Sequence, residues 1–257
     1  MVLGNFDILD KIVFSFFIAI PVLLFSVALF LRGKYLLSLI LLALSFYLHA
    51  TVSFFVSSLY VFYFIINYKE INKQLILSGL LSVVLIIPVI ISSISVKPLT
   101  TTGLNEWMHL LRLRVEGHFF PLSWSFLVYF TFFLTCVMFL ISYYHNEKTK
   151  NKKVLVMFFG SLLLLLFGFI FTEIYPVMEV IQMSLFRGWV IFRVIAYIYI
   201  IYFIVDVFRH SSSRLKKTIA LLAAIWLVSA ALIPMFIGSQ RGIIANEFFG
   251  VFSSIWR

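Results

Sequence analysis

Four polar side chains in the segment between residues 97 and 124 could bind a phosphate group and act on a hydroxyl. Arg112 and Arg114 are followed in the chain by Glu116 and His118. The planar guanidinium of arginine binds phosphate oxygens in pairs, and either Glu116 or His118 could remove a proton from an acceptor hydroxyl. The alternative is that these residues belong to an interfacial helix and only touch lipid headgroups. The sequence leaves both interpretations open.

Three further candidate residues lie in or beside long apolar runs. His49 interrupts the run 35–67, and a histidine there could carry protons or hydrogen-bond to neighbouring helices. Arg187 lies at the start of a later run and is a candidate phosphate ligand. Arg193, inside that run, could also bind phosphate, extend its charge to the interface, or pair with Glu173.

Other kinds of site lack support in the sequence. It contains no glycine-rich phosphate loop and no metal-ligand spacing, and the single cysteine excludes an internal disulfide. No metal is predicted, and a cofactor cannot be inferred. Aromatic residues lie inside the apolar runs rather than on a basic surface, so nucleic acid is not an expected partner.

The composition indicates a membrane protein. Hydrophobic residues make up 63% of the chain and charged residues 12%, whereas soluble domains are about half apolar and a quarter charged. One soluble core could not bury this much apolar surface, so lipid is the expected partner of the helices. The net charge of +10 then reflects basic loops between spans rather than a nucleic-acid surface.

The apolar runs predict an all-α fold, a single integral membrane domain over residues 1–257 with about eight membrane segments. An interfacial helix is expected in the loop 97–124, and residues 243–256 are expected to be interfacial or re-entrant. The predicted spans lie near residues 12–31, 35–48, 51–67, 75–96, 125–144, 154–172, 189–208 and 218–237.

The run from 35 to 67 is too long for one upright crossing. As a straight helix it would measure about 50 Å, against about 30 Å of hydrocarbon. We therefore expect the chain to fold back near His49, as two crossings or as one short crossing and a re-entrant piece. The loops 32–34, 68–73, 145–153 and 209–217 then lie on the same side of the membrane.

Charge supports this arrangement. With the later loops 145–153 and 209–217, that side holds twelve Lys and Arg residues and, counting Asp206, three acids, whereas the other side holds eight basic and seven acidic residues. The basic side is therefore expected to be the cytoplasmic side of the plasma membrane. All seven candidate residues then belong to the outer side.

Three short motifs resemble those of bacterial membrane glycosyltransferases and polysaccharide polymerases of the GT-C type. The first motif reads Arg114-Val115-Glu116-Gly117-His118-Phe119-Phe120-Pro121. It is similar to an outer-loop Arg-x-Pro-His-His-x-x-Pro pattern, from which Glu116 and Gly117 depart. His49-Ala50 resembles a His-Pro pair in an early span, with the proline replaced. Phe186-Arg187-Gly188-Trp189 resembles the arginine that opens a late span.

This resemblance implies glycosyl transfer or polymerisation at the outer face, from a polyprenyl-phosphate-linked sugar, in cell-surface polysaccharide assembly. Either Glu116 or His118 would deprotonate the acceptor, with help from His49. The phosphate ligands would be Arg112, Arg114, Arg187 and Arg193. The alternatives are a transporter or flippase subunit, with inverted repeats and mid-membrane polar groups, and a non-catalytic scaffold. A partner membrane subunit could complete the site.

Overall fold

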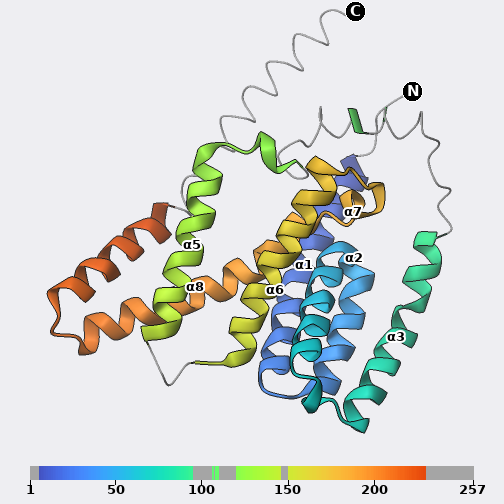
Figure 1. The fold of residues 1–257 in the computed structure, drawn as a ribbon. Coiled ribbons are helices and arrows are strands. Elements are labelled where there is room, and N and C mark those ends of the chain that lie inside the picture. Colours follow the sequence, from blue (N-terminus) through green and yellow to red (C-terminus); the bar gives the residue numbers. More distant parts are fainter. Residues whose placement is uncertain (1–5, 95–105, 107, 110–119, 146–149, 230–257) are drawn as a thin grey trace, which may run out of the picture. The chain divides into compact units, whose positions relative to one another are not determined.

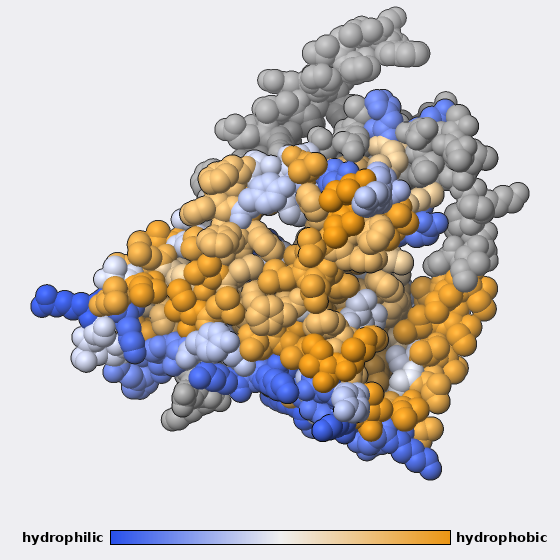
Figure 2. All heavy atoms as spheres, in the orientation of Figure 1, coloured by the Kyte–Doolittle hydropathy of each residue, from blue (hydrophilic) through white to orange (hydrophobic). Residues whose placement is uncertain are grey.

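The computed structural model describes residues 6–94, 106, 108–109, 120–145 and 150–229, without the side chains of 6–14 and 93–94. Within these residues the regular elements are all helices (Figure 1), which confirms the predicted all-α class. In the described part of the chain, five helices are long and apolar enough to cross a membrane, and the apolar helix Ser15–Leu31 is shorter. Hydrophobic residues cover much of the visible surface (Figure 2), as lipid contact requires.

The chain divides into two compact units. The first contains residues 1–125 and 151–194, and the second contains residues 126–150 and 195–257. The boundary falls within one helix, α8 (Leu185–His210). The prediction of a single membrane domain over residues 1–257 stays a prediction. The described candidate residues all lie in the first unit.

The first unit begins with α1 (Phe6–Leu31) and α2 (Tyr35–Ile66), and α2 is a hairpin rather than a rod. His49 breaks it with a non-helical backbone, φ −156° and ψ 92°. The rings of Tyr35 and Phe64, at its two ends, have centroids 5.4 Å apart, whereas a straight helix would separate these residues by about 44 Å. The predicted fold-back near His49 is therefore confirmed.

Buried polar side chains hold the two arms of this hairpin together. Ser26 of α1 lies 2.9 Å from the hydroxyl of Tyr60 and 3.2 Å from that of Ser38, and Ser38 donates to Tyr60 over 3.2 Å. Nearer the tip, the hydroxyls of Ser45 and Ser53 are 2.7 Å apart. Because an unpaired polar group in lipid costs several kcal/mol, these bonds fix the register of the arms.

Lys153, in the first turn of α6 (Lys152–Phe169), binds the end of the hairpin that lies opposite His49. Its ammonium donates to the Tyr35 hydroxyl over 2.7 Å and to the Phe30 carbonyl over 3.2 Å. It also lies 4.7 to 5.7 Å from the ring centroids of Tyr35, Phe30 and Tyr63. The hydroxyls of Tyr35 and Tyr63 donate to the two carboxylate oxygens of Glu70. This network ties α1, both arms of α2 and α6 together.

Lys153→Ala is expected to destabilise the chain by about 2 kcal/mol, because it removes two hydrogen bonds and a shielded cation–aromatic contact. Thermal unfolding in detergent measures the change. Lys152→Ala is the matched control, since Lys152 is its exposed neighbour on the same helix and should change stability by less than about 0.5 kcal/mol. Equal effects of the two substitutions would contradict the role given to the network.

The rest of the first unit packs around the hairpin. Helix α3 (Lys73–Ile94) lies along α2, where the hydroxyl of Ser82 donates to the carbonyl of Leu39. Helix α6 continues into a π-helical segment, η4 (Ile170–Ile174), followed by α7 (Met178–Gln182) and the start of α8. A short 3-10 helix, η2 (Pro121–Ser123), ends this part of the unit.

The second unit contains α5 (Phe126–His145), the later part of α8 and the helical residues 214–229. Met138, Ile200 and Ala223, one from each helix, form a buried cluster. At the end of α5, the Nε2 atom of His145 lies 3.1 Å from Asp206 of α8.

Most predicted spans correspond to helices of the structure. The spans near 12–31, 75–96, 125–144, 154–172 and 189–208 correspond to α1, α3, α5, α6 with η4, and α8. Residues 106 and 108–109 are helical, but the rest of the predicted interfacial helix lies outside the described residues. So do the end of the span 218–237 and all of 243–256.

Candidate functional site

His49 forms the tip of the α2 hairpin and is half-buried. Its Nδ1 atom lies 3.0 Å from the hydroxyl of Thr51, and its ring packs edge-on against Phe16, with centroids 5.3 Å apart. The His49 carbonyl accepts a hydrogen bond from Ser53 over 2.9 Å. These contacts orient the imidazole, whose Nε2 atom has no hydrogen-bond partner among the described residues.

The start of α8 brings Arg187 to this imidazole. Arg187 lies near enough to His49 for its charge to act on the imidazole, although the two residues are far apart in the sequence. Gly188 makes the approach feasible, because a Cβ atom there would overlap the ring of Phe55. Phe55 is fully buried in the second arm of α2. Glycine is therefore required where α8 meets the hairpin.

Ser184, in the turn between α7 and α8, combines two unfavourable features. Its φ angle is 45°, and among the described residues it is the one non-glycine residue with a positive φ. This conformation costs about 1–3 kcal/mol. Its side chain is 5% exposed, and the hydroxyl has no hydrogen-bond partner there. Such an unpaired buried group costs a further 1–3 kcal/mol, roughly.

Two contacts bring the segment 120–124 to the same region. The backbone N–H of Leu122 donates to the Glu173 carboxylate over 2.8 Å. The ring of Trp124 packs edge-on against Phe186 of α8, with centroids 5.3 Å apart. The end of the predicted outer loop therefore lies against η4 and the first turn of α8.

The predicted site residues thus have three outcomes. His49 and Arg187 are brought together. Arg193 is exposed, and among the described residues no ion pair joins it to Glu173, whose carboxylate is bonded to Leu122 instead. The remaining predicted residues lie outside the described part of the chain; they are Arg112, Arg114, Glu116 and His118.

Sequence reasoning missed Ser184 and the packing role of Gly188. Serine is common in turns and before helices, so nothing in the sequence distinguishes Ser184 from other turn serines. Gly188 was noted only as part of a motif. A glycine directly after a candidate arginine at the start of a span was the one signal of a close approach.

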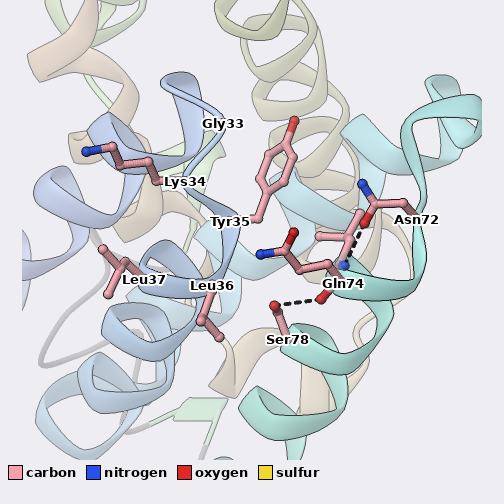
Figure 3. A pocket seen from close by; sticks show the side chains of 9 residues that line it. Gly33, Lys34, Tyr35, Leu36, Leu37, Asn72, Gln74 and Ser78 are labelled. Carbon is pink, nitrogen blue, oxygen red and sulfur yellow. Dashed lines mark hydrogen bonds between the residues drawn. The ribbon is translucent and has the colours of Figure 1, made fainter.

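A cavity of about 230 Å³ lies at the other end of the hairpin, between the starts of α2 and α3 (Figure 3). Two of its polar side chains are bonded locally: Asn72 accepts from the N–H of Leu75 over 2.9 Å, and Ser78 donates to the carbonyl of Gln74 over 2.7 Å. The Lys34 side chain points away from Asn72 and Gln74 (Figure 3). None of the described candidate residues, His49, Arg187 and Arg193, lines this cavity.

Arg187 and His49 are side chains of the types that bind anions and transfer protons. An arginine can bind a phosphate, and an oriented histidine next to it can take a proton from a hydroxyl. Within the described residues, no group of three or more His, Cys, Asp or Glu side chains is placed to hold a metal ion. No family model matches the chain, and no curated protein or solved structure matches it either.

Proposed function

We propose that this chain transfers or polymerises sugars at the outer face of the plasma membrane, with a polyprenyl-phosphate-linked sugar as donor. The observation that supports the proposal is that Arg187 lies near His49, although the two come from separate apolar runs. A cation and an oriented imidazole at one place are what transfer of a phosphate-linked group to a hydroxyl requires.

In the proposed reaction, Arg187 binds the phosphate of the donor and His49 accepts the proton of the acceptor hydroxyl. The hydroxyl oxygen forms a bond to the anomeric carbon of the sugar as the bond from that carbon to the phosphate oxygen breaks. The polyprenyl-linked phosphate leaves with the electron pair, and its negative charge is stabilised by Arg187.

The proposal includes a topology of about eight crossings, with the basic loops in the cytoplasm. The hairpin of α2 supports this sidedness, because both of its ends, which contact Lys153 and Glu70, lie about 20 Å along the arms from the tip at His49. If the basic ends face the cytoplasm, His49 and Arg187 lie toward the outer surface. The substrate would then approach laterally from the lipid.

Variants of His49 and Arg187 test the function in cells that make the surface polysaccharide. His49→Ala and Arg187→Gln are each expected to lower polymer amount by at least about tenfold, since each removes a group that acts on the reacting atoms. Polymer amount and chain length are measured at equal protein level in the membrane. Arg209→Gln, at the other end of α8, is the matched control and should leave the polymer unchanged.

Normal polymer from both site variants would contradict the proposal. Solute uptake by the purified chain in proteoliposomes, without any sugar transfer, would instead favour a transporter.

A further inference from the structure

The turn before α8 is held in a conformation that serine does not favour. Ser184 has a φ angle of 45°, in the left-handed region where glycine is the usual residue. Its N–H donates to the carbonyl of Ile181 over 3.0 Å, and its carbonyl accepts from the N–H of Arg187 over 2.9 Å. The backbone is therefore fixed from both sides. A strained residue that persists in this way is a reason to look for a role of its side chain.

The side chain of Ser184 is buried, and its hydroxyl has no hydrogen-bond partner within the described part of the chain. The residue is 5% exposed. A serine directly before a helix usually accepts a hydrogen bond from the first turn, but here the carbonyl, not the hydroxyl, accepts from Arg187. The hydroxyl thus keeps its hydrogen-bonding capacity at a position shielded from water, where a bond to a charged group is strong.

The surroundings of Ser184 suit an anion. It directly precedes α8, a helix of 26 residues, whose first N–H groups point out of the helix and carry partial positive charge. Arg187 lies one turn further along and acts on His49. The acids on α7 and η4, the elements that precede α8, are Glu179, which is exposed, and Glu173, which is bonded to the N–H of Leu122.

We propose that Ser184 and the first turn of α8 form a phosphate-binding site, in which the Ser184 hydroxyl donates to a phosphate oxygen beside Arg187. The choice of a polyprenyl phosphate as the natural ligand rests on the proposed function. The phosphate site itself is argued from Ser184 and α8 alone. Because the hydroxyl is shielded in this conformation, the side chains above it must move aside when the phosphate binds.

Two variants separate this role from a structural one. Ser184→Gly removes the hydroxyl and also relieves the left-handed strain, so the unliganded chain should become more stable. Its affinity for phosphate should nevertheless fall on the order of tenfold, because a hydrogen bond to a charged group is lost. Ser184→Ala should lose the same affinity without the relief of strain. Ser211→Gly, directly after the other end of α8, is the control.

The measurements use the full chain purified in a neutral detergent. One arm follows the rise in thermal unfolding temperature with inorganic phosphate, and the other compares binding of a polyprenyl phosphate with that of the uncharged polyprenol of equal length. A stabilised Ser184→Gly variant that has lost its response to phosphate supports the site. A variant that responds like the wild type, or a wild type that responds to neither phosphate probe, overturns it.

The two arms also distinguish the proposals from each other. If polyprenyl phosphate binds no better than inorganic phosphate, the phosphate site stands and the lipid carrier as its ligand is overturned. If Arg187→Gln abolishes polymer formation while Ser184→Gly binds phosphate normally, the transferase proposal stands and the role of Ser184 is overturned. If Ser184→Gly loses phosphate binding while His49→Ala and Arg187→Gln make normal polymer, the site survives without the transferase.

Discussion

Gly188→Leu is expected to lower the thermal unfolding temperature of the detergent-solubilised chain by on the order of 10 °C. A Cβ atom at Gly188 would already overlap the ring of Phe55, and a leucine adds three more carbons in the same place. Phe55 is fully buried, so its ring cannot turn toward solvent. The start of α8 must then separate from α2, which also moves Arg187 away from His49.

Substitutions of graded size test this explanation. Gly188→Ala should destabilise less than leucine but still measurably. Gly79→Ala is the matched control, because Gly79 lies in helix α3 and a Cβ atom added there would meet nothing within 4 Å among the described residues; it should be neutral or stabilise by up to about 1 kcal/mol. If Gly188→Leu unfolded at the wild-type temperature, the close packing of α8 against the hairpin would be wrong.

Spin labels on the two arms of α2 should lie within about 20 Å of each other, whereas a straight helix would place them about 44 Å apart. Leu36→Cys and Ile65→Cys are suitable positions, since their side chains are 39% and 67% exposed. Cys136 is buried and is replaced by alanine so that only the introduced thiols react. Electron spin resonance measures the distance.

A second labelled pair calibrates the measurement. Ile76→Cys and Ile87→Cys lie on one helix, α3, and should give a separation of about 17 Å along its axis. A distance near 40 Å between the α2 labels would refute the hairpin. The sidedness of the N-terminal segments would then invert, and His49 would no longer lie on the same side of the membrane as Arg187.

The membrane class, the helix positions and the fold-back at His49 could be predicted because they depend on local quantities. A bilayer has a nearly constant thickness, so the length of an apolar run shows how often it can cross. The run 35–67 exceeded that length, and its one interruption was the histidine. The basic loops lie on one side of the membrane only if this run folds back. The contact between Tyr35 and Phe64 shows the same fold-back.

The partners of the polar side chains could not be predicted in the same way. Arg193 and Arg187 look alike in the sequence, as arginines near the start of one span, yet Arg187 acts on His49 and Arg193 is exposed. The difference depends on the rotation of α8 about its axis. That rotation is set by contacts with distant residues, such as Phe55 against Gly188.

By itself, the sequence determined that this is a helical membrane chain with a hairpin at His49, because hydrophobic length and charge count are properties of consecutive residues. Only the tertiary structure decided that Arg187 lies near that histidine and that Ser184 is strained, buried and, among the described residues, unpaired. Those features arise where the start of α8 meets the α2 hairpin, and such long-range packing leaves no periodic signal in the chain.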